Sequence, residues 1–262
     1  MTSSQSARVR QPIKSRMGTS TVDRIVVRDL DLVNDLLGKV DLGQMAWLEI
    51  TGQLPTPSQA AVFNAVLVTL VEHGLTPNAI AARLTYLGAP EALQGAVAAG
   101  LCGMGSVFAG GSEGTVNMLL DARSKNPERS EAETAKAIVS DFMSNRKQIP
   151  GLGHHLHKPI DPRSKKLFEI AQQHGLRGKF VSLLEAIQAE AEARTSRLLP
   201  INATGAIGAL CCELGLPKAA ARGVAVIGRS VGLVGHLVEE AHSPIAKEIW
   251  LRAEEESSEP QE

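Results

Sequence analysis

The chain has 262 residues, a formal net charge of −1 and 44% hydrophobic residues. Such a balanced charge argues against a nucleic-acid-binding or membrane-surface protein. The apolar content suffices for one sizeable core or two modest ones. Aromatic residues make up only 3% of the chain, whereas Ala and Gly are abundant, which favours closely packed helices over a β-sandwich. No apolar run reaches the roughly 18–20 residues of a membrane span, so we expect neither a nucleic-acid nor a membrane partner.

Cysteine usage points to a reducing compartment. The three cysteines are Cys102 and the adjacent pair Cys211 and Cys212. An odd count with two neighbours forms no plausible disulfide framework, so we expect a cytoplasmic protein that uses cysteine as a small core residue.

Both ends of the chain differ from its middle in charge. Residues 1–22 carry four basic residues before the first acid and have no apolar segment typical of a secretory signal: Arg8, Arg10, Lys14 and Arg16. We predict a disordered basic arm here, although an organelle transit peptide would share this character. Residues 246–262 end in an acidic stretch without apolar periodicity and are predicted to be a solvated tail.

The region between the tails, 23–245, shows helical periodicity. Residues 24–52 predict a short strand and a first helix that ends at Gly52. Capping boxes at Thr56 and Ser130 mark two helix starts. The remaining helices follow from apolar spacing and from Gly and Pro positions. The predicted helices are 45–52, 57–74, 77–87, 94–105, 111–120, 131–147, 162–174, 180–198, 203–214 and 218–240. We therefore predict an all-α fold.

One predicted helix, 94–105, is crowded with small residues. Each glycine in a helix interior costs about 1 kcal/mol relative to alanine, so a close helix crossing or an intimate subunit contact must favour it. The glycine run Gly105 to Gly111 is not a phosphate-binding P-loop, because no Gly-Lys-Ser/Thr follows.

The most informative stretch is 151–163. Gly151 and Gly153 remove side-chain bulk, so that a ligand can lie against the backbone. Asp161 and Pro162 predict a helix start, which puts Arg163 near a helix N-terminus where anions bind. Between them lie four further polar residues: His154, His155, His157 and Lys158. A solvated basic loop is the plain alternative. A metal site at His155 and His157 with His154 or Asp161 is a weaker one, since no carboxylate or thiol cluster accompanies these residues.

The pattern Gly-x-Gly-His, then Lys four residues later, then Asp-Pro-Arg resembles the signature of the citrate synthase superfamily. Residues 72–74, 98–113 and 227–236 match the same family in order and spacing. The match is closest to citryl-CoA lyases and to the citrate synthase-like module of ATP-citrate lyase, and it covers roughly residues 23–240. The resemblance implies a large helical core with a small helical subdomain, roughly 130–215. It also implies a homo-oligomer, either a dimer or a tetramer.

The resemblance assigns roles to particular residues. His73 and His154 would handle the substrate oxygen, and Arg163 and Arg229 would clamp carboxylates through bidentate hydrogen bonds. The remaining assignments are substrate contacts at His236 and Phe108, and coenzyme A contacts at Gly151, Leu152, Gly153 and Lys158.

Three features depart from the family pattern. Thr204 occupies the place of the catalytic Asp, and a hydroxyl cannot act as a carboxylate base; His155 and His157 are the candidate substitutes. No clear Arg matches the carboxylate ligand that a partner subunit contributes, and Lys247 and Arg252 are the nearest options. Phe108 stands where citrate synthases have a His. The ATP-citrate lyase module also has an aromatic residue there, so this departure favours the lyase branch.

The resemblance therefore implies an enzyme that cleaves a C–C bond in a CoA thioester. Its substrates would be a CoA thioester and a di- or tricarboxylate, with citryl-CoA cleavage to acetyl-CoA and oxaloacetate as the first reaction to test. No metal is expected. A condensing acyltransferase of the citrate synthase type is one alternative. A non-catalytic homologue that retains CoA or carboxylate binding is another, because of Thr204.

Overall fold

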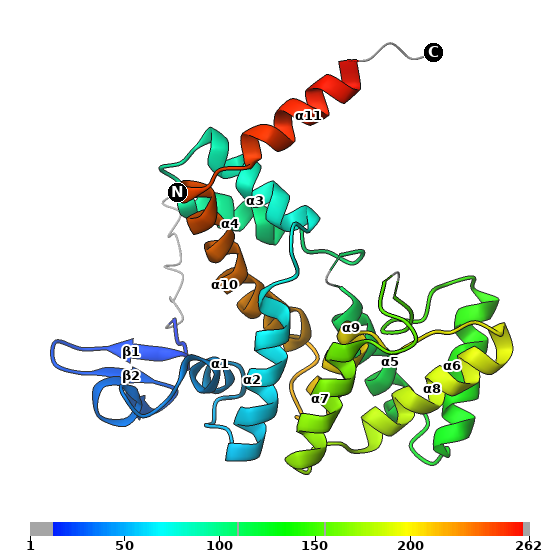
Figure 1. Cartoon of the computed structure of the whole chain (residues 1–262). Coiled ribbons are helices and arrows are strands. Elements are labelled where there is room, and N and C mark those ends of the chain that lie inside the picture. Colours follow the sequence, from blue (N-terminus) through cyan, green and yellow to red (C-terminus); the bar gives the residue numbers. More distant parts are fainter. Residues whose placement is uncertain (1–12, 109, 155, 259–262) are drawn as a thin grey trace, which may run out of the picture. The chain divides into compact units, whose positions relative to one another are not determined.

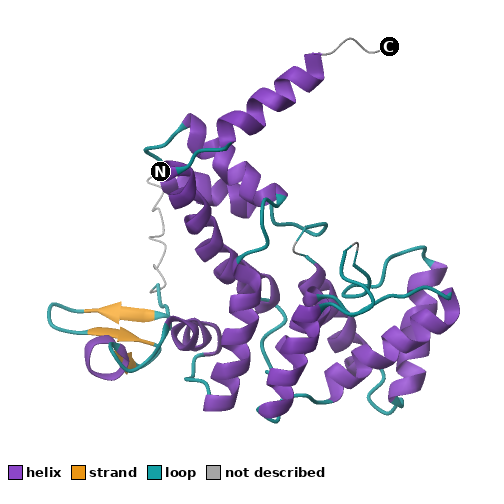
Figure 2. Cartoon of the chain, in the orientation of Figure 1, coloured by secondary structure: helices purple, strands orange, loops and turns teal. Residues whose placement is uncertain are grey.

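The computed structural model describes residues 13–108, 110–154 and 156–258. They form two compact units, one up to Leu54 and one from Pro55 onward, and each is described separately (Figure 1). The described residues are mostly helical (Figure 2), which confirms the predicted all-α class.

The first unit contains the strands. Its small antiparallel sheet has the order β1 (Gly18–Ser20), β2 (Ile25–Val27), β3 (Leu30–Asp31), followed by a π-helix, η1 (Leu32–Leu36), and α1 (Leu42–Thr51). The strand and helix predicted in 24–52 are both present. The disordered arm predicted at 1–22 is wrong for residues 18–20, because the β-branched run of β2 gives them a strand to pair with. Residues 1–12 lie outside the described part.

The second unit consists of helices joined by loops, with an isolated β-bridge between Leu152 and Ile201. Its elements are α2 (Pro57–Val71), α3 (Pro77–Gly88), α4 (Leu93–Cys102), α5 (Gly111–Lys125), α6 (Glu131–Ser144), α7 (Pro162–Gln173), α8 (Lys179–Thr195), α9 (Ala203–Glu213), α10 (Ala220–His242) and α11 (Ala246–Ser258). Both predicted capping boxes form, at Thr56 before α2 and at Ser130 before α6. The predicted acidic tail is instead helical as far as Ser258. An ion pair between Glu248 and Arg252 joins successive turns of α11.

The core is built from small side chains. Helix α9 is buried over nearly its whole length, and most of its buried residues are Ala, Gly or Cys. In α4, a Cβ added at Gly100 would lie 2.9 Å from the carbonyl oxygen of Asn78 on α3 and from Leu233 on α10. Gly100 is therefore explained by a close crossing inside this unit, whereas a Cβ at Gly95 would meet only Ala92, just before α4. Burial raises the pKa of the Cys211 and Cys212 thiols to about 12, so both are inert core residues as predicted.

Helix α10 has 23 residues and is apolar enough to cross a membrane by length and composition. This is weak support for a span, because 44% of its most apolar window is buried and the core helix of a soluble protein passes the same test. Its buried residues pack against α2, α3 and α4.

The end of α2 lies directly on α10. A Cβ at Gly232 would fall 1.9 Å from the carbonyl oxygen of Val71, the last residue of α2, whereas Gly235 has no atom within 4 Å of its Cβ direction. Only glycine lets the two backbones meet at position 232. This contact fixes where the chain leaves α2, and His73 follows two residues later.

Gly232→Ala should therefore lower the free energy of unfolding by about 1–3 kcal/mol, because the methyl group forces the two backbones apart. Gly235→Ala is the matched control on the same helix and should raise the stability by up to about 1 kcal/mol through helix propensity. Urea denaturation followed by circular dichroism measures both. Equal effects of the two substitutions would contradict this account of the contact.

Candidate functional site

The loop between α6 and α7 is tied to the start of α9. Gly151 and Gly153 have φ of 83° and 81°, and a Cβ at Gly151 would lie 2.5 Å from the Cα of Gly205. Leu152 forms an isolated antiparallel bridge with Ile201. The backbone N–H groups of Leu152 and Gly153 donate to the carbonyls of Ile149 and Pro200. The expectation that a ligand lies against these N–H groups is therefore wrong for these two, which hold the loop together.

Asp161 organises the other end of this loop. Its side chain is fully buried and caps α7, where Oδ1 accepts hydrogen bonds from the backbone N–H and the Nε of Arg163, both at 3.0 Å. Oδ2 accepts from Arg163 Nη2 at 2.8 Å and from the backbone N–H of Ala203 at 3.1 Å. Burial on its own would raise the pKa of Asp161, but the hydrogen bonds and charge of Arg163 hold it below the ordinary value.

His154 is oriented by its own loop. Its Nδ1 accepts hydrogen bonds from the backbone N–H groups of Leu156 and His157, at 3.1 and 3.0 Å. A neutral His154 therefore carries its proton on Nε2. This Nε2 atom lies 3.3 Å from Nη2 of Arg163. The structure thus brings together two residues that the sequence assigned to one site.

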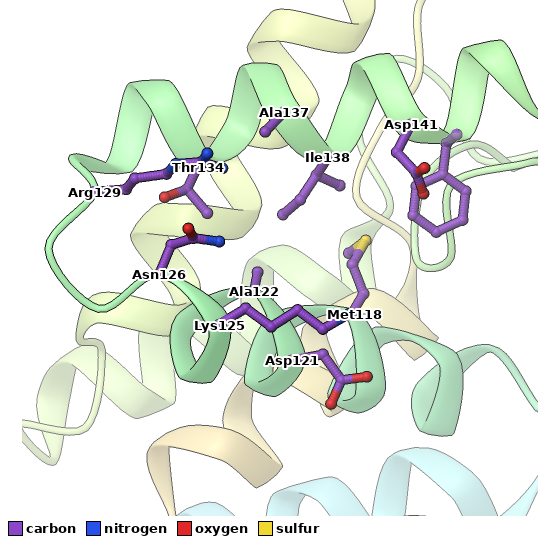
Figure 3. Close-up of a pocket in the computed structure, with 11 residues that line it drawn as sticks. Met118, Asp121, Ala122, Lys125, Asn126, Arg129, Thr134, Ala137, Ile138 and Asp141 are labelled. Atoms are coloured by element: carbon purple, nitrogen blue, oxygen red, sulfur yellow. The ribbon is translucent and has the colours of Figure 1, made fainter.

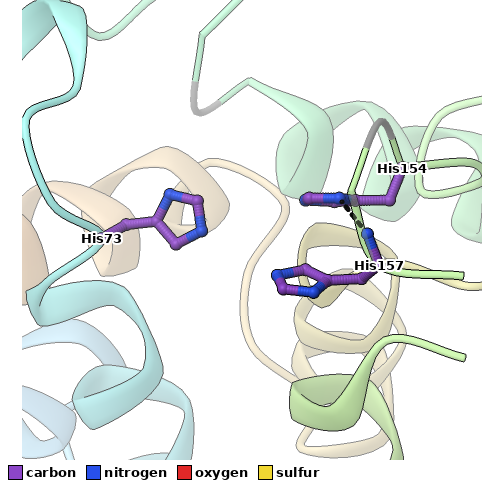
Figure 4. A group of neighbouring side chains, drawn as sticks. All are labelled: His73, His154 and His157. Carbon is purple, nitrogen blue, oxygen red and sulfur yellow. Dashed lines mark hydrogen bonds between the residues drawn. The ribbon is translucent and has the colours of Figure 1, made fainter.

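Three imidazoles meet in this place (Figure 4). One ring nitrogen from each of His73, His154 and His157 lies within 4.8 Å of the others, and the rings of His154 and His157 have centroids 4.4 Å apart. Burial lowers the pKa of His73, and the positive charges of Arg163 and Arg229 lower it further. His73 is therefore predominantly neutral at pH 7 and can accept a proton.

The cluster fits an anion better than a metal cation. Three imidazoles are a common ligand set for zinc, but a guanidinium already lies beside Nε2 of His154 and the carboxylate of Asp161 is bound to that guanidinium. Positive charge at this position repels a dication and attracts a carboxylate. His155, part of the predicted metal alternative, lies outside the described residues.

Arg229 supplies a second cation. It projects from α10, its exposed fraction is 8%, and its Nη1 is buried without a hydrogen-bond partner among the described residues. Burial lowers the pKa of Arg229, while the charge of Glu72 opposes this shift. A buried guanidinium with an unused donor is costly, so the position suits an anionic ligand. The charges of Arg163 and Arg229 both lower the pKa of His73, and we assign the three residues to one candidate site.

Thr204 lies beside a large cavity at the N-terminal turn of α9. Its Oγ1 donates a hydrogen bond to Oδ1 of Asn202 at 2.7 Å and packs against the backbone of Gly111. The cavity has a volume of about 1110 Å³, and its lining includes Thr204, His154, the loop 147–153 and the exposed Arg197. This volume is large enough for a nucleotide-sized ligand. A smaller cavity of about 240 Å³ between α5 and α6 contains none of the predicted residues (Figure 3).

The other predicted residues have different surroundings. Phe108 is half-buried in the turn before α5, and Lys158 is exposed on the loop. His236 is buried and faces Arg83 and Glu72. Neither Arg83 nor Glu72 was identified from the sequence as a neighbour of the site. The one available signal for a buried charge was the lone arginine on the apolar face of α3.

Asp161→Asn should lower the free energy of unfolding at neutral pH by about 3 kcal/mol, because it leaves Arg163 without its buried partner. The folded-state pKa of Asp161 is lowered, so its stabilisation is present above the unfolded pKa and is lost as pH falls through the folded value. The difference from wild type should therefore shrink below about pH 4. Urea denaturation across the pH range measures this, with the exposed Asp141→Asn as control. A pH-independent difference would contradict the assignment.

Comparison with known proteins identifies the family of this chain. Residues 15–250 match the model of the family "Citrate synthase, C-terminal domain". Citrate synthase 2 of Bacillus subtilis is 24% identical over 192 residues, covering 73% of this chain and 50% of the relative. The chain thus spans about half the length of that relative, and 36% of the citrate synthase of Deinococcus radiodurans, which is 29% identical over 143 residues.

Two solved structures extend the comparison. The structure of citryl-CoA lyase from Hydrogenobacter thermophilus is 30% identical with a TM-score of 0.81, covering 89% of this chain and 88% of that chain. ATP citrate lyase from Methanothrix soehngenii, solved in complex with citrate and coenzyme A, shares the fold at 20% identity with a TM-score of 0.74, covering 89% of this chain and 40% of that one. The predicted resemblance is confirmed, and the chain belongs to the citrate synthase family.

Proposed function

We propose that this protein cleaves the C–C bond of a CoA thioester of the citryl-CoA type, giving acetyl-CoA and oxaloacetate or a related acyl-CoA and 2-oxo acid. The observation that carries the proposal is the buried Nη1 of Arg229, which has no hydrogen-bond partner among the described residues, together with a predominantly neutral His73 and the neighbouring side chains of Arg163 and His154. The similarity to a citryl-CoA lyase over most of both chains supports it.

Each residue has a role that its surroundings suit. Arg163 and Arg229 bind substrate carboxylates, and the Nε2–H of His154 donates to the oxygen on the carbon that becomes the ketone. His73 accepts the proton of the hydroxyl group on that carbon. The electrons of the C–C bond then pass to the thioester as an enolate, and a proton added at its α-carbon completes acetyl-CoA. The oxygen that loses its proton becomes the carbonyl of the 2-oxo acid.

The nucleotide part of coenzyme A would occupy the large cavity. Gly151, Leu152 and Gly153 line it, and the exposed cations Lys147 and Arg197 stand at its edge within reach of phosphate groups. Lys158 is exposed on the same loop and would add a third cation. Because the loop's own N–H groups of Leu152 and Gly153 are used internally, side-chain cations would carry most of the phosphate contact.

Two alternatives remain within the same family. The curated relatives named above are citrate synthases, which favours a condensing acyltransferase. Thr204 favours a homologue that binds CoA and carboxylates without turnover. We also predict a homo-oligomer in which Lys247 or Arg252 completes a neighbour's site. A cytoplasmic location is a further prediction.

The proposal is tested by mixing purified protein with citryl-CoA and measuring oxaloacetate through coupled NADH oxidation and acetyl-CoA by chromatography. Wild type should produce both in equal amounts. Arg229→Met should abolish turnover and the thermal shift with oxaloacetate, yet keep or raise the free energy of unfolding, because it removes a buried guanidinium whose Nη1 has no hydrogen-bond partner among the described residues. Arg177→Met, at an exposed arginine just before α8, is the control. A thermal shift with CoA without turnover in wild type would favour the binding-only alternative.

Thr204 makes the reaction directional. Cleavage needs only a proton donor for a strongly basic enolate, whereas condensation needs a base that removes a weakly acidic C–H proton. Wild type should therefore be poor at exchanging the methyl protons of acetyl-CoA in deuterated buffer. Thr204→Asp should raise the exchange rate, within the roughly 10²–10⁴-fold that a positioned base supplies, because the first turn of α9 favours an anionic side chain.

Thr204→Asn is the matched control, since it has the shape of Asp without its basicity. Mass spectrometry of deuterium in acetyl-CoA gives the readout. Rapid exchange already present in wild type would show that another group is the base, and His157 would be the next residue to substitute.

A further inference from the structure

A chain of buried polar side chains begins at Arg83 on α3. The exposed fraction of Arg83 is 0%, yet it carries a full charge. Its Nε and Nη2 lie 3.2 and 2.9 Å from Nδ1 of His236, Nη1 donates to Glu240 at 2.7 Å, and Nη2 also donates to Glu239. All three partners are on α10. A buried guanidinium is tolerated only when such acceptors surround it, so this contact specifies where α10 and α3 meet.

The guanidinium also determines the state of His236. Because arginine can only donate, Nδ1 of His236 must accept, and the proton of the neutral ring is on Nε2. Nε2 lies 3.0 Å from Oε2 of Glu72, in a geometry short of a hydrogen bond, and has no other partner among the described residues. The imidazole thus presents a buried N–H on the side of Glu72.

Glu72 connects this imidazole to the candidate site. Its Oε1 accepts a hydrogen bond from the backbone N–H of His73 at 2.9 Å and another from Gly74. Its Oε2 faces His236 and would lie 3.4 Å from a Cβ added at Gly232. The carboxylate therefore lies over the glycine where α2 meets α10. Glu72 is half exposed, with a side-chain exposure of 49%. Its position therefore depends on these contacts more than on burial.

We propose that Arg83, His236 and Glu72 are positioning residues that hold His73 within the imidazole and arginine cluster. The chain of contacts runs from a guanidinium inside the core to the backbone N–H of His73. Its kinetic meaning rests on the proposed function. The position of the His73 ring can be measured without any turnover, because its titration reports the groups around it.

A purely structural role is the competing explanation. Oε1 of Glu240 accepts hydrogen bonds from the backbone N–H groups of Ile245 and Ala246 at 3.0 and 2.8 Å, so Glu240 also caps α11. Replacing Arg83 would disturb that cap together with the core. His236 is the better target, because it lies between Arg83 and Glu72 and has no part in α11.

The test compares two variants of His236 in the full-length chain. His236→Gln keeps an oxygen that accepts from Arg83 and an N–H₂ that donates to Glu72, whereas His236→Phe keeps the ring volume and removes both contacts. The exposed His242→Gln, on the same helix, is the control. Urea denaturation of each variant confirms folding.

The primary readout is the NMR titration of the His73 imidazole, identified by its loss in His73→Gln. The charged and titratable groups that face His73 are Arg163 from α7, Arg229 from α10, Asp161, His154 and His157 from the loop, and the neighbouring Glu72. If His73 moves away from the two guanidinium groups, its pKa returns upward toward the ordinary value. We expect this rise in His236→Phe, and wild-type titration in His236→Gln and His242→Gln.

The second readout is turnover of citryl-CoA. His236→Phe should lower kcat by about 10- to 100-fold, as expected for a misplaced proton acceptor, with KM for the thioester unchanged, and His236→Gln should restore kcat. Unchanged His73 titration in His236→Phe would overturn the proposal, and so would a His236→Gln variant that behaves like His236→Phe. If no variant turns over citryl-CoA but the titrations move as expected, the proposed function fails and the positioning role stands.

Should His236→Phe not fold, Glu72→Asp replaces it. Aspartate keeps the charge at this half-exposed position but is too short to reach both His236 and the His73 backbone. The pKa of His73 should then rise as well, while an unchanged titration would again overturn the proposal.

Discussion

The structure of the site depends on the buried carboxylate of Asp161. Its two oxygens bind the N-terminal turn of α7, the guanidinium of Arg163 and the first N–H of α9. One carboxylate therefore joins the loop that carries His154 to the helix that carries Thr204. A buried anion is stable only with such a full set of donors. The side chain of Arg163 consequently lies beside His154, and its remaining donor capacity faces the imidazole cluster.

The charge of the site follows from this arrangement. Arg163 gives most of its hydrogen bonds to Asp161, whereas Arg229 has no hydrogen-bond partner for Nη1 among the described residues. Both guanidinium groups lower the pKa of His73. Without ligand the second unit therefore holds a buried cation that costs stability. A bound carboxylate would remove that cost, which gives a physical reason for binding anionic substrates in particular.

Much of this could be predicted from the sequence, where the signal was local. The capping boxes at Thr56 and Ser130 and the Asp-Pro start of α7 depend on residues within one helical turn, and all three are present. The glycine-rich loop and the assignment of His154 and Arg163 to one site followed from the family pattern. The Arg83–His236 contact joins residues 153 positions apart, and no local pattern encodes it. The strand β1 and the helix α11 were missed because each forms where composition alone suggested solvated chain.

Backbone contacts, more than side-chain packing, determine where the functional groups enter the site. Gly151 and Gly205 approach so closely that a Cβ on either would overlap the other. His154 lies three residues after Gly151, and Thr204 directly precedes Gly205. At Gly232 the same kind of contact joins α10 to the end of α2, just before His73. Positions fixed by backbone contact cannot adapt through rotamer changes, because closely packed interiors resist displacement. A site that holds three imidazoles close to two guanidinium groups needs this rigidity. The close backbone contacts that small residues allow thus hold the charged groups of the site in position.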